Sequence, residues 1–159
     1  MYERENCSAA RALEVVGERW SLLIIRNAAF AGMTRFSEFE RRLGVAPNIL
    51  AKRLNDFVAN GVMEVVEPAA GETGRAYRLT PKGRELGKVV IALTAWGDRW
   101  AAPDGAPVIY RHRGCGGTVS VTTACTGCAE HPSVADVDAH PGPGATPEQR
   151  AAMTARLAP

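Results

Sequence analysis

Four side chains in the C-terminal third have the types and the spacing of a metal-binding site. Two residues separate His112 from Cys115 and Cys125 from Cys128, and glycines lie beside each pair. Such a spacing lets one tight turn present two ligands, and zinc takes four nitrogen or sulfur ligands in a tetrahedron. The pattern therefore predicts a structural zinc site of the zinc-ribbon type, with His131 as an alternative fourth ligand.

Two other interpretations of these cysteines remain open. Cys125 and Cys128 could form a redox pair, or the segment could be a β-hairpin that packs on the dimer and binds no metal. In the zinc interpretation, residues 108–113 and 118–123 could form the hairpin that joins the two ligand pairs. Residues 108–144 are few and polar, so this segment would fold poorly alone. Because a bound metal would offset that deficit, zinc is the favoured interpretation.

The remaining cysteine, Cys7, lies at the start of the first predicted helix. A helix N-terminus can lower a thiol pKa and so favour the reactive thiolate, which makes Cys7 a candidate redox sensor. The alternative is a small buried residue, which is a common environment for a free cysteine.

A cytoplasmic location is expected for this chain. The N-terminus shows no apolar signal-peptide core, and the longest apolar run, at Leu22–Ile25, is far shorter than the ~18–20 residues of a membrane span. In a reducing compartment, cysteines serve as metal ligands or redox sensors more readily than as disulfides.

Residues 47–59 are predicted to form a helix with two different faces. Leu50, Leu54 and Phe57 recur at helical spacing and mark the buried side. The opposite face is small and polar, with one positive charge, and consists of Asn48, Ala51, Lys52 and Asn55. Asparagine pairs naturally with adenine and lysine with guanine, so this face could enter a major groove of DNA. An ordinary solvated helix surface is the alternative.

The elements that must position this helix follow from periodicity and from glycine and proline punctuation. Helices are expected at residues 8–16, 20–31, about 37–43 with Ser37 as a candidate cap, 47–59 and 81–100; strands are expected at 62–67 and 75–80. This order predicts an α+β fold, a winged helix-turn-helix domain in which the hairpin is the wing. A small C-terminal β-hairpin or zinc-ribbon-like module follows it.

The predicted boundaries divide the chain of 159 residues into four parts. Residues 7–100 form the winged-helix domain, 101–107 a linker rich in alanine and proline, and 108–144 the small Cys/His module. Residues 145–159 form a short helix or a frayed tail, and Thr146 and Gln149 have the spacing of a capping box.

Several motifs in the same order resemble the HxlR family of bacterial winged-helix regulators, which is MarR-like. They are Cys7–Leu13, Gly17–Arg26, Arg35–Phe39, Leu50–Leu54, Gly61–Val62 and Tyr77–Leu86. The resemblance implies a homodimer, with the first and last helices of the domain as dimerisation helices, and binding to a palindromic operator. It also supports the sensing role of Cys7, because some members use a cysteine at this place to sense oxidants or electrophiles.

The resemblance and the helix pattern together give a predicted DNA interface. Base contacts are expected from Asn48, Ala51, Lys52 and Asn55; phosphate contacts from Arg35, Arg41, Arg42 and Arg53; wing contacts from Arg75 and Arg78; Ser37 and Pro47 complete the set. For any single arginine, a plain surface role is the alternative. Trp96 and Trp100 are predicted to pack in the dimer. The family usually has serine before the proline of the recognition helix, but this chain has Ala46, and a lost cap typically costs ~0.5–2 kcal/mol.

Composition and missing motifs narrow the function classes. Residues 1–100 carry 15 Lys and Arg against 12 Asp and Glu, whereas residues 101–159 carry 4 against 5, which fits a local DNA-facing patch. The sequence has no phosphate-binding loop, nucleophile elbow or metal-hydrolase motif, so it is not expected to be an enzyme. The rival class is a protein-interaction module that keeps the winged helix without binding DNA. A small-molecule effector fits either class, and its identity is not encoded in any motif.

Overall fold

The computed structural model describes residues 6–67 and 74–157. The chain divides into two compact units. The larger unit consists of Arg11–Val121, and the smaller one joins Met1–Ala10 to Thr122–Pro159. None of the described helices combines the length and the apolar character that a membrane span requires.

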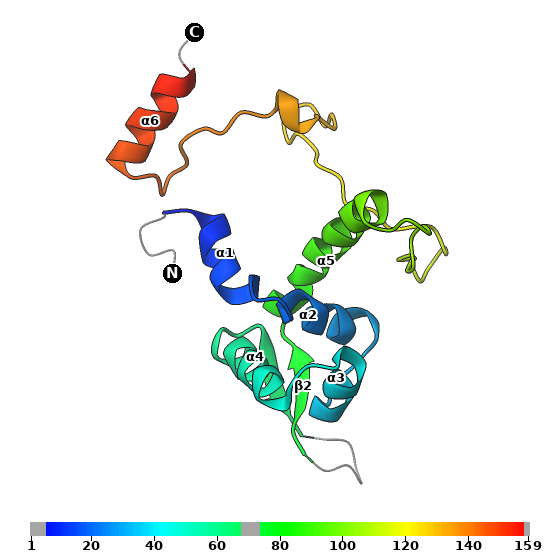
Figure 1. Cartoon of the computed structure of the whole chain (residues 1–159). Coiled ribbons are helices and arrows are strands. Elements are labelled where there is room, and N and C mark those ends of the chain that lie inside the picture. Colours follow the sequence, from blue (N-terminus) through cyan, green and yellow to red (C-terminus); the bar gives the residue numbers. More distant parts are fainter. Residues whose placement is uncertain (1–5, 68–73, 158–159) are drawn as a thin grey trace. The chain divides into compact units, whose positions relative to one another are not determined.

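The larger unit has the α+β architecture that the sequence predicts. Its elements, in chain order, are α1 (Ser8–Val16, of which the first three residues belong to the smaller unit), α2 (Ser21–Phe30), α3 (Phe36–Leu43), α4 (Pro47–Ala59), β1 (Met63–Val66), β2 (Ala76–Leu79) and α5 (Pro81–Trp100) (Figure 1). β1 and β2 pair antiparallel, with Glu64 opposite Arg78. Helices α3 and α4 therefore form the helix-turn-helix, and the two strands form the wing.

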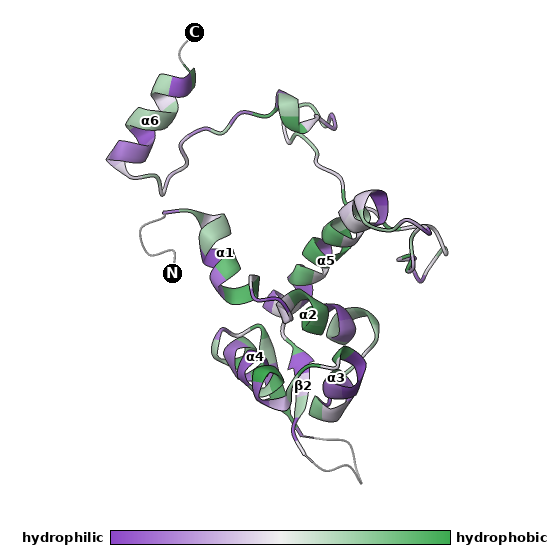
Figure 2. Cartoon of the chain, in the orientation of Figure 1, coloured by the Kyte–Doolittle hydropathy of each residue, from purple (hydrophilic) through white to green (hydrophobic). Residues whose placement is uncertain are grey.

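The core of this unit lies where α2, α3, α4 and the sheet meet. α2 is strongly hydrophobic (green in Figure 2) and contributes Ile24 and Ile25, both with no exposed surface. α4 contributes Leu50, Leu54 and Phe57, spaced so that they share one side of the helix. Val62, Met63, Tyr77 and Leu79 close the core from the sheet side. The apolar side of α4 is thus the side that faces inward.

The turn between α3 and α4 sets how the two helices meet. Gly44 ends α3 in the left-handed conformation, at φ 61°, and its N–H donates to the carbonyl of Glu40. Ala46 then occupies the N-cap of α4, and its side chain makes no capping hydrogen bond. The absence of a side-chain cap, which the sequence predicts, is therefore confirmed. Pro47 begins the helix and has no N–H to leave unsatisfied.

Ser37 is not the cap of α3, so that prediction is wrong. The helix begins one residue earlier, at Phe36, and Arg35 is its N-cap. The Glu38 carboxylate accepts hydrogen bonds from the backbone N–H groups of Arg35 and Thr34, each at 2.9 Å. These two bonds hold the pKa of Glu38 below its usual value. A carboxylate at the third helical position satisfies the free N–H groups better than the serine could.

The wing is joined tightly to α5. The Thr80 hydroxyl caps α5 by accepting from the N–H of Gly83 at 3.1 Å, and it donates to the carbonyl of Gly61 at 2.7 Å. A Cβ at residue 83 would collide with the carbonyl oxygen of Val62. Glycine at this position therefore lets the first turn of α5 approach the start of β1.

The C-terminal segments differ from the expected hairpin in one respect. Residues 108–121 form no strand, and Arg111 and Thr118 make a single antiparallel bridge.

In the smaller unit, α6 (Pro147–Leu157) follows a short turn of 3₁₀ helix at Val134–Asp136. The predicted capping box is present: the Gln149 N–H donates to the Thr146 hydroxyl, and the Thr146 N–H donates to the Gln149 side chain. The domain boundaries drawn from the sequence stay a prediction.

Candidate nucleic-acid interface

The outward side of α4 carries the polar residues that the sequence assigned to DNA. Asn48, Lys52 and Asn55 are exposed, and Ala51 is half-buried. The Lys52 side chain is 68% exposed. These side chains point to solvent because Leu50, Leu54 and Phe57 occupy the other side of the helix. Pro47, the first residue of α4, is exposed as well.

Asp56 connects the two cations of α4 and was missed by the sequence analysis. Its Oδ2 atom lies 3.1 Å from Lys52 Nζ and 3.0 Å from Arg53 Nη2. The Arg53 side chain is only 11% exposed, so this arginine is tied to its own helix more than it is presented to a ligand. Because the ion pair between Lys52 and Asp56 is exposed, it contributes little to the free energy of folding. Lys52 can therefore leave Asp56 for another partner with little loss of stability. The spacings of four and three residues to Asp56 are the signal that could have revealed these pairs.

The residues of α3 fall into two groups. Arg41 and Arg42 are exposed in its last turn and line a hollow of about 410 Å³ together with Met33 and Glu38. Ser37 is exposed in its first turn. Arg35 is half-buried, because its backbone caps the helix and bridges to Ala76. Arg41 and Arg42 thus remain available to a phosphate, whereas Arg35 is partly committed to the fold.

The two wing arginines also differ. Arg78 is paired across the sheet with Glu64, its Nη2 atom 2.9 Å from Oε1. Arg75 is exposed where the described part of the wing begins again after Glu67. The turn expected between the two strands spans residues 68–74, and all of it except Gly74 lies outside the described residues. Arg75 is therefore better placed than Arg78 to meet a phosphate.

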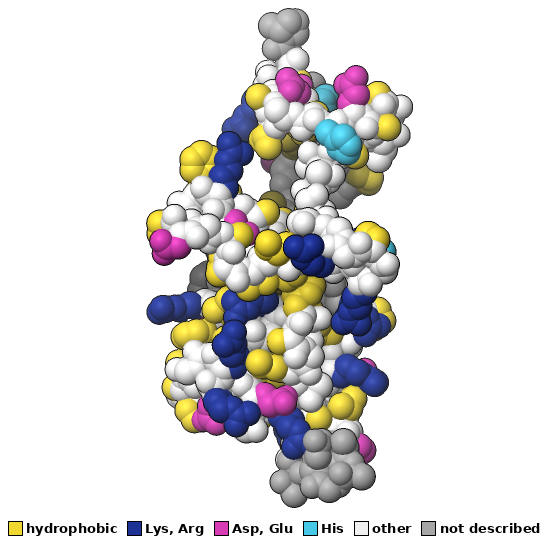
Figure 3. Space-filling model, turned by 90° about the vertical axis from the view of Figure 1, so that its right-hand side faces the viewer, with side chains coloured by type: hydrophobic (Ala, Val, Ile, Leu, Met, Phe, Trp, Pro, Cys, Tyr) yellow, Lys and Arg dark blue, Asp and Glu magenta, His cyan; other side chains and the backbone are white. Residues whose placement is uncertain are grey.

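The surface of the larger unit mixes charges of both signs. Figure 3 shows Lys and Arg side chains spread over one face, with Asp and Glu among them. Such a surface does not attract nucleic acid as a polycation would. Binding to DNA would therefore depend on a few well-placed contacts.

The cysteine and histidine pairs form two turns with the same backbone pattern. The His112 N–H donates to the carbonyl of Gly117, and the Gly116 N–H donates to the carbonyl of His112. The Cys125 N–H donates in the same way to Glu130, and Ala129 donates to Cys125. Gly116 and Ala129, which hold equivalent places, both have positive φ, at 73° and 62°. Ala129 is the only described residue other than glycine with positive φ, which shows how firmly the second turn imposes this pattern.

Each turn brings its own two side chains together. His112 Nδ1 lies 3.3 Å from Cys115 Sγ. Cys125 Sγ accepts from the backbone N–H groups of Cys128 and Gly127, which lower the pKa of the Cys125 thiol. Within the described residues, no three His, Cys, Asp or Glu side chains form a metal-binding group, and His131 Nδ1 instead contacts the carbonyl of Thr123. Zinc therefore stays a prediction.

Cys7 is exposed, and the residue before it is held by α6. The Asn6 side-chain amide donates to the carbonyl of Gly144 at 2.7 Å and to Gln149 Oε1 at 2.8 Å. The Gln149 amide donates back to the Asn6 carbonyl at 2.9 Å. The alternative of a buried structural cysteine is therefore wrong for Cys7, whose thiol is open to solvent.

Comparison with known proteins agrees with this architecture. The model of the HxlR-like helix-turn-helix family matches residues 15–105. The HTH-type transcriptional regulator Rv3095 of Mycobacterium tuberculosis is 40% identical over 141 residues, which cover 88% of this chain and 89% of that protein.

Two solved structures are also similar. The crystal structure of PA1607, described as a transcription factor, shares 39% identity with a TM-score of 0.77 and covers 87% of this chain and 96% of its own. The redox regulator HypR in its reduced form shares 26% identity with a TM-score of 0.50, covering 58% of this chain and 92% of its own. With the family model matching more than half of its length, the chain belongs to the HxlR-like helix-turn-helix family of transcriptional regulators.

Proposed function

We propose that this chain is a cytoplasmic transcriptional regulator that binds a palindromic operator as a homodimer. The observation that carries the proposal is the orientation of α4, whose apolar side is buried and whose asparagines and lysine are exposed. A helix of 13 residues is about 20 Å long, which suits insertion into a major groove. Asn48, Lys52 and Asn55 would contact base edges, with Ala51 against a base or a thymine methyl group. Arg41, Arg42 and Arg75 would contact phosphates, and Arg35, Ser37, Pro47, Arg53 and Arg78 would support this set.

The homodimer is supported by an exposed apolar stripe on α5. Val89, Leu93, Trp96 and Trp100 follow one another at spacings of four, three and four residues, so they share one face of the helix. Their exposed fractions run from 45% to 66%. A contiguous apolar face of this kind marks a protein interface, and an identical stripe on a second copy would cover it with two-fold symmetry.

Replacement of Lys52 tests the DNA interface. In a gel-shift or anisotropy titration with an operator selected from random duplexes, Lys52→Ala should weaken binding by ~1–3 kcal/mol and relax the sequence preference. Lys88→Ala removes the same charge from an exposed position on α5, and it should leave the sequence preference for the operator unchanged. If Lys52→Ala binds as tightly and as selectively as the unaltered chain, the assigned orientation of α4 on DNA is wrong. If the unaltered chain selects no duplex at low or high salt, it acts as a protein-interaction module instead.

Replacement of Trp96 tests the dimer. Trp96→Glu places a charge in the middle of the apolar stripe and should shift the chain from dimer to monomer in sedimentation equilibrium. Ala95→Glu adds the same charge one residue away on the exposed but more distant side of α5, and it should remain dimeric. Equal dissociation constants for the two variants would show that the stripe is not the dimer contact.

We also propose that Cys7 makes operator binding responsive to oxidants or electrophiles. Its exposure, its place beside α1 and the similarity to a redox regulator support this role. Mild oxidant or an electrophilic quinone should lower operator affinity in the unaltered chain but not in Cys7→Ser. Cys115→Ser is the control, because it removes another exposed thiol and should keep the response. Operator binding that survives Cys7 modification would contradict the proposal.

Zinc is proposed as a structural ion held by His112, Cys115, Cys125 and Cys128, with His131 as the alternative ligand. Two turns with one backbone pattern, each offering two ligands, support this donor set. Metal analysis of protein purified without a histidine tag should give about one zinc per chain. Cys128→Ser should lower that content, whereas Cys7→Ser should not. A zinc content near zero would leave the redox pair and the metal-free turn as the interpretations of these residues.

A further inference from the structure

Three ion pairs of the described residues lie on α4 and the wing, the two elements that carry most of the predicted DNA contacts. On α4, the Asp56 carboxylate pairs with both Lys52 and Arg53. On the wing, the Glu64 carboxylate pairs with Arg78. The N···O distances run from 2.9 to 3.1 Å. Each carboxylate thus occupies cations that a DNA phosphate would otherwise attract.

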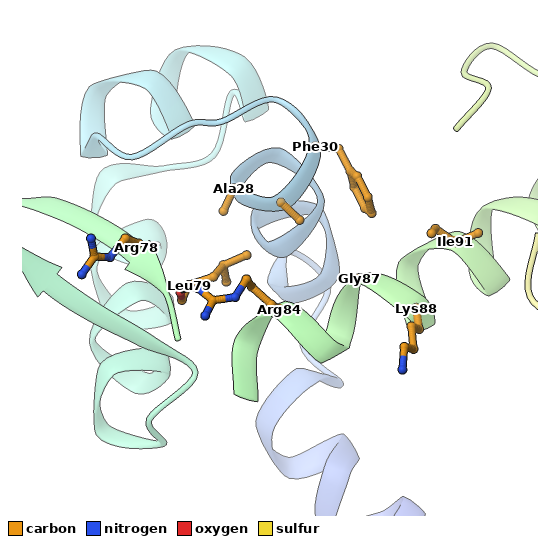
Figure 4. Close-up of a pocket in the computed structure, with 9 residues that line it drawn as sticks. Ala28, Phe30, Arg78, Leu79, Arg84, Gly87, Lys88 and Ile91 are labelled. Atoms are coloured by element: carbon orange, nitrogen blue, oxygen red, sulfur yellow. Dashed lines mark hydrogen bonds between the residues drawn. The ribbon is translucent and has the colours of Figure 1, made fainter. Parts of the chain in front are cut away.

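Two cations of α5 on the same unit have no such partner. Arg84 and Lys88 extend from α5 around a hollow that Ala28 and Phe30 of α2 also line (Figure 4). Arg84 Nη1 donates to the backbone carbonyl of Leu79 at 2.8 Å. Among the described side chains, no carboxylate forms an ion pair with Arg84 or Lys88. Pairing with a carboxylate is therefore not a property of every cation on this surface.

Asp56 lies at the border between the polar and the buried sides of α4. With about 3.6 residues per turn, it follows Lys52 by one turn and lies between Lys52 and Arg53 around the helix axis. Its side chain is 39% exposed, compared with 68% for Lys52 and 11% for Arg53. The carboxylate therefore reaches one cation on each side, the first exposed and the second largely buried.

Arg53 keeps the Asp56 carboxylate in place. Because its side chain is largely buried, Arg53 is less free than Lys52 to move to another acceptor, and its Nη2 atom lies 3.0 Å from Asp56 Oδ2. Lys52 Nζ approaches the same oxygen atom at 3.1 Å from the exposed side. The carboxylate is thus a fixed point on α4, against which the Lys52 ammonium is held.

The ion pair leaves Lys52 able to contact bases. An ammonium group has three N–H donors, and Asp56 accepts from one of them. The other two suffice for O6 and N7 of one guanine, the pair of acceptors that a lysine reads in the major groove. Contact with guanine therefore does not require Lys52 to leave Asp56. A swing of the flexible side chain toward the phosphate backbone does require it.

We propose that Asp56 is a positioning residue that holds Lys52 for base contact and so determines operator selectivity. This inference rests on the proposed function of the chain as a DNA-binding regulator. The ion pair opposes each phosphate contact of Lys52 but not its guanine contact. It also reduces the entropy lost when a long side chain is ordered on the operator. Asp56 therefore raises the affinity for the operator relative to the affinity for other DNA.

Titration of the full chain against two duplexes tests the role of Asp56. One duplex carries the operator selected from random sequences, and the other is a shuffled duplex of the same composition. Asp56→Asn should lower the ratio of operator affinity to shuffled-duplex affinity about fivefold, the effect of one exposed ion pair. Affinity for the shuffled duplex should rise. Its logarithm should fall more steeply with the logarithm of salt concentration, by about 0.9 for one more neutralised phosphate.

Control variants separate the positioning of Lys52 from a general effect of charge. Asp56→Glu keeps the carboxylate and should keep the affinity ratio of the unaltered chain. Glu85→Gln removes a negative charge from an exposed position on α5, and it should change both affinities by the same factor. In a chain that already carries Lys52→Ala, Asp56→Asn should change the ratio less than about twofold, because the side chain that Asp56 positions is absent.

A purely structural role for Asp56 gives a different result. A variant that loosens α4 would bind both duplexes more weakly, whereas the proposal expects the affinity for the shuffled duplex to rise. Asp56→Ala provides a second neutral replacement, with a higher helix propensity, if the asparagine variant does not fold.

Equal affinity ratios for Asp56→Asn and the unaltered chain would overturn the inference. The same loss of selectivity in chains with and without Lys52 would also overturn it, because Asp56 would then act as a general negative charge. Both results leave the proposed function intact. An unaltered chain that prefers neither duplex contradicts the proposed function and the inference with it, so the two failures are distinguishable.

Discussion

The burial of one side of α4 is the interaction on which the arrangement of the proposed DNA interface depends. Leu50, Leu54 and Phe57 have at most 1% of their surface exposed, and each buried side chain of this kind contributes ~1.5–3 kcal/mol. The same contacts that stabilise the core therefore fix the rotation of the helix about its axis. A rotation of half a turn would expose three large apolar side chains and bury Asn48, Lys52 and Asn55 without partners. Orientation of the polar face is thus a consequence of the core, and it does not need a DNA ligand.

The order and bounds of the helices were predictable because local signals agree with the fold. The apolar period, Gly44 and Pro47 mark the helix-turn-helix, and Thr80 and Pro81 mark the start of α5. Serine is a common capping residue, so the sequence pointed to Ser37, but the Glu38 carboxylate accepts from the free backbone N–H groups of Thr34 and Arg35 instead. The commitment of Arg53 to Asp56 was not predicted because it depends on burial as well as on spacing.

The C-terminal residues illustrate a different limit. Spacing identified both turns, and their shared hydrogen-bond pattern would have been hard to foresee, because Ala129 takes the place that glycine holds in the first turn. The strands expected around the first turn reduce to one bridge between Arg111 and Thr118, because isolated two-stranded pairs are marginal in water. The capping box at Thr146 and Gln149 was predictable, and the bonds of Gln149 to Asn6 were not, since they join residues 143 positions apart.

Photo-crosslinking gives the most direct test of the claim that α4 presents its polar face to DNA. A photoreactive residue would replace Asn48 on α4 or, in a parallel sample, Lys88 on α5. Residue 48 should crosslink to the selected operator at two places about 10 base pairs, or a multiple of that, apart, as two α4 helices of a dimer require. Residue 88 should not crosslink. Absence of crosslinks from residue 48, or crosslinks from residue 88 alone, would contradict the account.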